Sequence, residues 1–440
     1  MQNVRNVADE MKPDLSSQTT LKWAVWIAFI AQAWNSIFGT STIAFLGSYN
    51  FTFGEVSMVS GAIALALGWR RYGIRPTVFT AAVGVFAAVT ALNFMRGMNE
   101  NPAMALVAAR GTVPLAVLLL LGAVRYPGTL LRDYVVRSAT AVAILLSVIV
   151  ILRLVLGPQF LMLAGGGLNV ADINDGGRAL PAQGAFLIAV AAVLQLSAAL
   201  RSLKGSGRSV ALAAAFFVIL VLTGQGTATI AAIAGLVVIL SMEWGPALGV
   251  RVLIGSSFAV AVVILAISLQ TFDPNDWAGV LPGTILENLD RRTANLGTRE
   301  MVWRVAWTAY QQGARIDQIV GWPTGSTPEL ILVTRSWGHV VWTNSVHSMY
   351  FGVLLGQGAV GLAAYLTMLA ATLINALHSV LRRQGAVPLA LVLMIGIFSY
   401  SYGLAVEQAL ILAVAASALP IRNLARRPRQ HRRVQALSAT

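Results

Sequence analysis

Cysteine is absent from the 440 residues of this chain, and charged residues make up only 11% of it. The lack of cysteine excludes disulfides, iron–sulfur clusters and thiol catalysis. A soluble domain of this length would carry roughly a quarter charged residues, so the scarcity of charge argues against a soluble protein. Lysine is the rarest of the charged residue types. Of the 31 Lys and Arg residues, only Lys12, Lys22 and Lys204 are lysines.

Metal-binding patterns are also lacking. The sequence contains no HExxH, HxxxH or DxD motif, and these are spacings at which His and carboxylate side chains hold metals. The segments "DINDGGR" (172–178) and "DPND" (273–276) offer carboxylates without that spacing. We therefore expect neither a metal nor a cofactor.

Long apolar runs dominate the chain instead. Hydrophobic residues make up 57% of it, and the mean hydropathy is +0.73. The runs extend over about 17 to 25 residues, which is the length needed to cross a hydrocarbon core. Amphipathic helices of a soluble core would be shorter and would show a polar stripe. These features predict an all-α, polytopic membrane protein.

The apolar runs predict about twelve transmembrane helices and one long periplasmic loop with an amphipathic helix. The polar residues up to Thr20 precede a first run that is too long for the core of a signal peptide, so this run is expected to remain as an anchor. The spans are expected near residues 22–46, 54–69, 77–95, 104–124, 138–156, 183–200, 209–223, 227–243, 252–270, 347–376, 388–404 and 407–421.

The basic residues predict the topology. All basic short segments fall on one side of the membrane if the N-terminus is inside, as the positive-inside rule requires. The net charge of +14 therefore indicates orientation rather than nucleic-acid binding, and both termini are expected in the cytoplasm. The basic segments are 70–76, 125–137, 201–208, 378–385 and the tail 422–435.

This topology divides the chain into consecutive segments. We expect a cytoplasmic N-terminal tail (1–21), the first nine transmembrane helices (22–270), the long periplasmic loop (271–346), the last three helices (347–421) and a basic cytoplasmic tail (422–440). Two shorter outer segments are expected at 95–104 and 157–184.

The long outer loop is expected to be partly folded or functional, because loops of this length rarely lack structure. Trp303, Trp307 and Tyr310 recur in it at helical spacing, with Arg299 and Arg304 between them. This pattern predicts an amphipathic helix at the membrane surface. We expect the loop to fold over a cavity whose floor is formed by the outer ends of the middle spans.

His347 opens the run "SVHSMYFGVLLGQGAVG" and is expected on the outer side. Guanidinium groups bind diphosphate in a bidentate way, and a neutral imidazole accepts a proton from a hydroxyl. Together they suit group transfer from a lipid-linked diphosphate. The arginines expected on the same side are Arg178, Arg291, Arg292, Arg299, Arg304, Arg315 and Arg335, with Arg110 and Arg153 in the outer turns of their spans.

Each of these features also has a plainer interpretation. His347 would then be an ordinary interfacial residue, and the outer arginines would snorkel or pair with acids of the same loop. Gly352 and Gly356 form a GxxxG motif, which is typical of helix packing. The segment "TGQGT" (223–227) would be a tight turn between two short spans.

Two segments resemble the O-antigen ligase and polymerase superfamily. "TREMVWRVAWTAYQQGARIDQIVGWPTGS" and "SVHSMYFGVLLGQGAVGLAAYL" are similar to its pattern of an arginine, a tryptophan four residues on, a GxG segment, and a His-Asn or His-Ser pair opening a span with GxxG. "GGRALPAQGAFLIAV" is similar to the family's Arg-Gly-Pro segment and places Arg178. The other matching positions are Arg299, Trp303, Gly321 to Gly325, His347-Ser348 and Gly358-Gly361.

The chain departs from the family at one turn. The family has a Ser-Arg-Gly-like turn between two middle spans, and its arginine reaches toward the diphosphate. Here Gln225 stands at that position. A glutamine forms hydrogen bonds but does not neutralise phosphate. Two alternatives follow: Arg110 or Arg178 replaces the missing arginine, or the donor or the chemistry differs from that of the family.

The resemblance implies a metal-independent glycosyltransferase of the bacterial inner membrane. It would take a glycan from a polyprenyl diphosphate on the periplasmic face and transfer it to lipid A core, another lipid-linked glycan or a protein hydroxyl. His347 would act on the acceptor hydroxyl. Arg299 would bind the donor diphosphate, with Arg178 as its partner. The full set of expected substrate-binding residues is Arg299, Arg178, Arg304, Arg110 and Gln225.

A secondary transporter or a flippase of lipid-linked sugars is the rival interpretation, because about twelve spans with both termini inside are common in transporters. Transporters usually show internal repeats and a polar site at the membrane midplane. Here the two halves differ, and charges within the spans are nearly absent. The outer clustering of arginines favours the enzyme.

Overall fold

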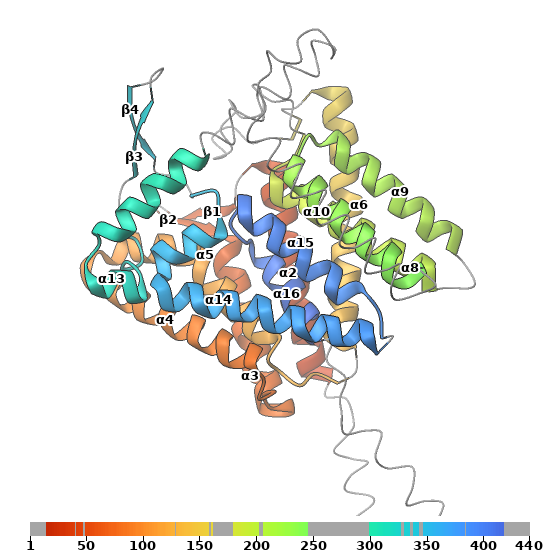
Figure 1. The fold of residues 1–440 in the computed structure, drawn as a ribbon, viewed down its shortest axis with the longest axis horizontal. Coiled ribbons are helices and arrows are strands. Elements are labelled where there is room, and N and C mark those ends of the chain that lie inside the picture. The colour runs from red at the N-terminus through yellow and green to blue at the C-terminus, as the bar shows by residue number, and fades with distance from the viewer. Residues whose placement is uncertain are drawn as a thin grey trace, which may run out of the picture.

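The computed structural model describes residues 15–39, 41–46, 49–127, 129–157, 160–161, 179–201, 206–244, 299–326, 330–334, 338–342, 346–382 and 384–417. These residues are mostly helical (Figure 1), and the protein is an all-α membrane protein, as the sequence predicts. Six of the described helices are long and apolar enough to cross a membrane. They are Val78–Glu100 (α4), Pro102–Leu121 (α5), Leu130–Leu156 (α6), Ala182–Arg201 (α8), Gly226–Glu243 and Met349–Leu381 (α14).

The helix at Gly226–Glu243 contains α10 (Gly226–Ile239) and most of a π-helical turn, η1 (Leu240–Trp244). Three shorter apolar helices coincide with the expected spans at 209–223, 388–404 and 407–421. They are α9 (Ser206–Leu222), α15 (Val387–Ser401) and α16 (Val406–Ser417). The expected span at 252–270 lies outside the described residues.

The first expected span, 22–46, is wrong at its end. Helix α2 (Leu15–Phe38) stops at Gly39, which has a left-handed φ of 72° and donates its N–H to Asn35 O at 3.0 Å. A glycine in this conformation is a common helix terminator. The chain then forms an antiparallel hairpin of β1 (Thr42–Leu46) and β2 (Tyr49–Thr52), and it enters α3 (Phe53–Tyr72).

Helix α8 is buried along much of its length. Its residues 185–193 are fully buried, and it packs against α6, α9, α10 and α15. Small residues recur along it, which allows neighbouring helices to approach closely. In the rest of the bundle, α2 packs on α3 and α6, α5 packs between α3 and α4, and α14 runs beside α4 and α15 (Figure 1).

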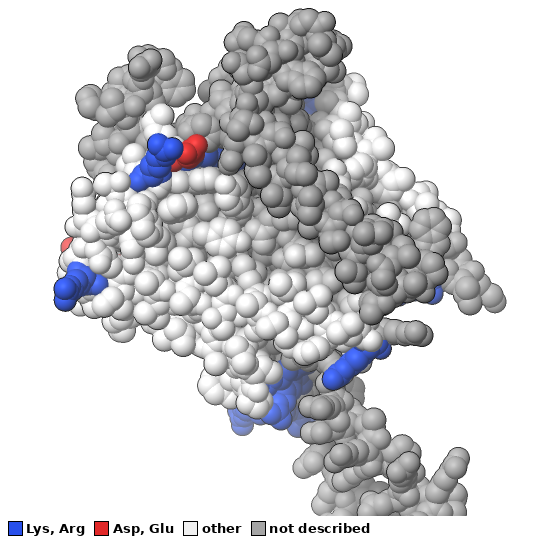
Figure 2. Space-filling view, in the orientation of Figure 1, with Lys and Arg blue, Asp and Glu red and all other residues white. Residues whose placement is uncertain are grey.

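Several of the basic connections lie against one another. The connections after α3 and α5 pair through an isolated β-bridge, and Arg75 Nη1 donates to Ser417 O at 2.9 Å, at the end of α16. In a second group, Glu243 accepts hydrogen bonds from the Arg201 side chain and from the Ala386 N–H. Segments that the charge pattern assigns to one side are therefore in contact. Among the described residues that Figure 2 leaves in view, basic side chains lie near the edges of the face, and the middle is uncharged.

A second junction joins α4 and α14 to the short helix α13 (Arg315–Val320). Arg96 Nη2 forms an ion pair with Asp317 at 2.6 Å, and its Nη1 donates to Gly321 O at 2.7 Å. Asn93 Nδ2 donates to Gly356 O at 3.0 Å and also to Val320 O. This junction fixes the chain that follows the amphipathic helix onto two transmembrane helices.

Two glycines at this junction are required by close backbone contact. Gly321 has a φ of 91° and Gly358 a φ of 64°, and a Cβ atom at either position would overlap backbone atoms of the facing segment. In contrast, a Cβ at Gly352 or Gly356 meets no described atom within 4 Å. Among the described residues, glycine is therefore required at Gly321 and Gly358, and the Cα positions of Gly352 and Gly356 show no such requirement.

The last strands, β3 (Leu330–Thr334) and β4 (Gly338–Trp342), form a second antiparallel hairpin within the segment expected as a long loop. Pairing runs from Leu330 opposite Trp342 to Thr334 opposite Gly338. The expectation that this loop contains structure of its own is confirmed for its described part.

Candidate functional site

Residues 299–312 are helical, as the spacing of their aromatic residues predicts, and they dock on the beginning of α14 and the end of α15. Trp303 Nε1 donates to Val346 O at 3.0 Å. Its ring stacks on Phe351 with centroids 6.0 Å apart and meets Tyr400 edge-on at 4.9 Å. The described contacts of this helix are therefore with the start of α14 and the end of α15, and the expected cavity beneath the whole loop stays a prediction.

Arg299 and His347 both lie beside Tyr402, the residue that follows α15. Arg299 Nη2 and the Tyr402 hydroxyl are 3.0 Å apart, and the guanidinium carbon lies 4.7 Å from the ring centroid. The His347 ring is edge-on to Tyr402 with centroids 6.5 Å apart. Phe398 stacks on the same tyrosine with centroids 5.0 Å apart. Two residues that the sequence proposed for one site are thus brought together around a third.

His347 has an unusual backbone conformation, with a φ of 48°. Residues other than glycine rarely adopt positive φ, and holding one there costs about 1–3 kcal/mol unless the surroundings compensate. Its neighbours supply that support, because Val346 O is bonded to Trp303 and Ser348 begins α14 as its N-cap. Backbone strain of this kind often occurs at active sites.

Tyr402 was missed by the sequence interpretation. It leaves the helix in an extended conformation (φ −145°, ψ 152°), with its N–H still bonded to Phe398 O at 3.0 Å. The segment "SYSYG" (399–403) carries two tyrosines where a span ends, and this pattern is the signal in the sequence that points to Tyr402. Tyrosines are common at membrane interfaces, so the pattern alone did not separate Tyr402 from an anchor.

Arg304 does not join this site. Its side chain is 78% exposed and forms an ion pair with Glu300 at 2.6 Å on the same helix. Five residues of α-helix turn a side chain by about 140° relative to the first. Arg304 therefore points away from the face that carries Arg299, and the structure gives no support to its predicted role in substrate binding.

Gln225 is buried in the turn between α9 and α10, and none of its described hydrogen bonds is to Arg299 or His347. It is 4% exposed, and its Nε2 donates to Leu180 O at 2.7 Å. Its amide therefore anchors the segment that enters α8. Arg178, the other predicted donor ligand near this turn, lies outside the described residues.

Arg110 forms an ion pair with Glu55 at 2.7 Å, and the two side chains are only 17% and 15% exposed. Glu55 also accepts the Thr52 N–H at 2.8 Å, in the capping box of α3. The positive charge of Arg110 is thus compensated inside the protein. This arrangement argues against Arg110 as the replacement for the arginine missing at position 225.

Arg153 has a structural role, because its side chain is bonded to backbone carbonyls. It is 2% exposed and donates to Ser36 O at 3.0 Å, Ala179 O at 2.9 Å, Ile37 O at 2.5 Å and Phe160 O at 3.2 Å. Two of these carbonyls belong to the last turn of α2, where a cation is favourable. Arg153 therefore joins three segments of backbone.

Among the described residues, no group of three or more His, Asp or Glu side chains is placed to hold a metal ion. Glu407, in the first turn of α16, is fully buried, and neither carboxylate oxygen has a hydrogen-bond partner in the described part of the chain.

The cluster of Arg299, Tyr402 and His347 combines a cation, a phenol and an imidazole. Such a set can bind an anion and move a proton.

No protein-family model and no curated protein matches this chain. The functional assignment therefore depends on the motifs and on the geometry of the site.

Proposed function

We propose that this chain is a glycosyltransferase of the bacterial inner membrane that transfers a glycan from a polyprenyl diphosphate to a hydroxyl acceptor, as an O-antigen ligase or polysaccharide polymerase does. One observation carries the proposal: Arg299 and His347, far apart in the sequence, both contact Tyr402. The resemblance of the same two positions to the ligase and polymerase superfamily supports it independently.

The proposed reaction assigns one task to each group. The oxygen of the acceptor hydroxyl attacks the anomeric carbon of the donor glycan, and the bond from that carbon to the diphosphate oxygen breaks. The polyprenyl diphosphate leaves with the bonding electrons, and Arg299 binds its charge through paired N–H donors. His347 accepts the hydroxyl proton, or holds the hydroxyl in line for attack. Tyr402 positions the guanidinium between these partners.

The proposed topology has about twelve spans, with the loop at 271–346 and the site on the periplasmic face. Its support is the distribution of charge along the sequence, together with the contacts among basic connections. Polyprenyl-linked donors would then reach the site from the outer leaflet.

The test is a reconstituted assay in which the full-length protein receives a polyprenyl-diphosphate-linked glycan and an acceptor. Arg299→Ala should lose far more transfer than Arg299→Lys, because a lost buried phosphate contact costs about 2–5 kcal/mol. His347→Ala should reduce the rate by about 10²–10⁴-fold if the imidazole acts as a base. His347→Gln keeps a hydrogen bond without basicity, so it separates a base from an orienting group.

Arg304→Ala is the matched control, since it removes the same charge from the opposite face of the same helix. Wild-type transfer by folded Arg299→Ala and His347→Ala proteins would reject the proposal. Movement of the lipid-linked glycan across vesicles without any transfer would instead identify a transporter or flippase.

A further inference from the structure

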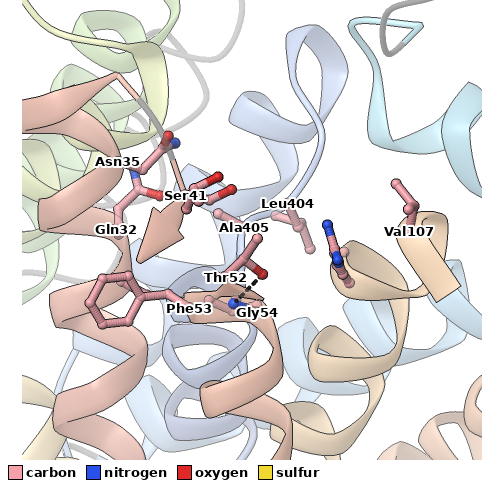
Figure 3. Close-up of a pocket in the computed structure, with 14 residues that line it drawn as sticks. Gln32, Asn35, Ser41, Thr52, Phe53, Gly54, Val107, Leu404 and Ala405 are labelled. Atoms are coloured by element: carbon pink, nitrogen blue, oxygen red, sulfur yellow. Dashed lines mark hydrogen bonds between the residues drawn. The ribbon is translucent and has the colours of Figure 1, made fainter. Parts of the chain in front are cut away.

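A cavity of about 470 Å³ lies apart from the Arg299 cluster. Its walls come from α2, the hairpin β1–β2, the start of α3, α5 and the residues Leu404 to Val406 before and at the start of α16 (Figure 3). This volume lies within the range of small-molecule sites, which is about 300–1,000 Å³. The connection that follows Tyr402 therefore forms part of the cavity wall.

The lining is rich in neutral hydrogen-bonding groups. Gln32 and Asn35 from α2 contribute amides, and Ser41 and Thr42 contribute hydroxyls. The Thr52 hydroxyl also lines the cavity, but it is bonded to Glu55 and Gly54 in the cap of α3. Amides and hydroxyls each offer both donors and acceptors. A polyhydroxylated ligand needs such mixed partners, because each sugar hydroxyl donates one hydrogen bond and accepts others.

Apolar surface completes the lining. Val107, Leu404 and Ala405 contribute apolar side chains to it (Figure 3). Apolar surface beside a few placed polar groups is the usual composition of a specific small-molecule site. Here it provides a surface for the C–H face of a sugar ring.

Charge in the cavity is compensated. Arg110 lines it, but this arginine forms the ion pair with Glu55 at 2.7 Å. A diphosphate would have to compete with that carboxylate for the guanidinium, whereas an uncharged sugar would not. The cavity therefore favours a neutral glycan over the charged end of a lipid-linked donor.

We propose that this cavity binds an uncharged sugar unit of the acceptor glycan. The assignment as acceptor site rests on the proposed function, because it requires that Arg299 holds the donor diphosphate. Its further support is the short connection between the cavity and the cluster, since Leu404 lines the cavity two residues after Tyr402. An acceptor held there would lie next to the connection that carries the tyrosine contacted by His347.

Two glycines provide a matched pair of blocking variants. Gly111 lines the cavity and Gly84 lies on α4 outside it, and a Cβ at either position meets no described atom within 4 Å. Gly111→Phe should fill the cavity without backbone overlap, and Gly84→Phe adds the same bulk elsewhere. Asn35→Leu is a second variant that removes a lining amide.

The first experiment is saturation-transfer NMR of the full-length protein in detergent with maltose, lactose and cellobiose as probes. We expect at least one disaccharide to bind, with at least tenfold weaker binding to Gly111→Phe and Asn35→Leu and no change for Gly84→Phe. Absence of binding by all three sugars, or equal binding to both glycine variants, would overturn the proposal. So would displacement of the sugar by inorganic diphosphate. These outcomes do not depend on whether the protein transfers glycan.

The second experiment tests the acceptor role in the transfer assay. Asn35→Leu should raise the KM for the acceptor at least tenfold, while the KM for the donor and kcat stay near wild type. A rise in the donor KM alone would overturn the acceptor assignment. If wild-type protein transfers nothing but still binds sugar in the cavity, the proposed function fails and the acceptor assignment fails with it, whereas the sugar site stands.

Discussion

Arg153 and Arg299 both lie in helical segments, but their surroundings differ. Arg153 is buried and directs its donors to main-chain carbonyls of three segments. Arg299 is half-buried, and in the described part of the chain its side chain makes one hydrogen bond, to a tyrosine hydroxyl. The comparison shows that two arginines expected on the same outer face have different roles. Arg153 links backbone segments, whereas Arg299 lies beside side chains that can take part in chemistry.

The largest effect on stability is expected from Arg153→Met. The substitution keeps an unbranched apolar stem but leaves several buried carbonyls without a donor, and each costs about 1–3 kcal/mol. Thermal unfolding in detergent should show a large fall in the melting temperature or a loss of folded protein. Arg137→Met, at an exposed position of the same helix, is the control. If both variants melt alike, Arg153 is not a structural cross-link.

An intermediate effect is expected at the junction of α4 with α13. Arg96 and Asp317 are 23% and 16% exposed and form a close ion pair. A double-mutant cycle of Arg96→Ala and Asp317→Ala should give a coupling energy of about 0.5–3 kcal/mol, as neighbouring side chains in one network usually do. Strictly additive changes in unfolding free energy would show that the pair does not hold α13 in place.

A smaller effect on stability is expected from Arg299→Ala, in spite of its large expected effect on transfer. The hydrogen bond to Tyr402 and the cation–π contact each contribute about 0.5–1.5 kcal/mol at a partly exposed site. The variant should therefore melt close to wild type while its transfer activity is lost. Tyr402→Phe should reproduce part of the loss of activity, because it removes the hydroxyl that contacts the guanidinium. A large loss of stability in Arg299→Ala would show that this arginine has a structural role like that of Arg153.

The smallest effect is expected from Arg304→Ala. An exposed pair at this spacing on a helix is worth about 0.3–0.5 kcal/mol. Both the melting temperature and the rate of transfer should stay near wild type. A loss of transfer as deep as that of Arg299→Ala would mean that the outward face of this helix also meets substrate.

Much of the helical architecture could be predicted from the sequence. Long apolar runs with few charges must become helices in a bilayer, because only helices satisfy their own backbone hydrogen bonds there. The amphipathic helix at 299–312 could also be predicted, because Trp303, Trp307 and Tyr310 recur at helical spacing. The end of the first span was not predicted, because apolar β-branched residues after Gly39 suit a strand as well as a helix.

The candidate site was predicted only in part. The resemblance pointed to Arg299 and His347, and the structure brings both to Tyr402. Arg304 and Gln225 have other described partners, which are Glu300 and Leu180 O. One side chain faces outward on its helix and the other bonds to backbone, and neither property is visible in a motif.

The sequence by itself determined that this chain enters a membrane as helices, because composition and run length fix how backbone polar groups are satisfied in lipid. Only the tertiary structure decided which arginines are available for chemistry. Whether a guanidinium bonds to carbonyls, as in Arg153, to a carboxylate, as in Arg110, or to a phenol beside His347, as in Arg299, depends on which distant segments meet it. These contacts between distant segments follow from helix packing, and short motifs do not encode them.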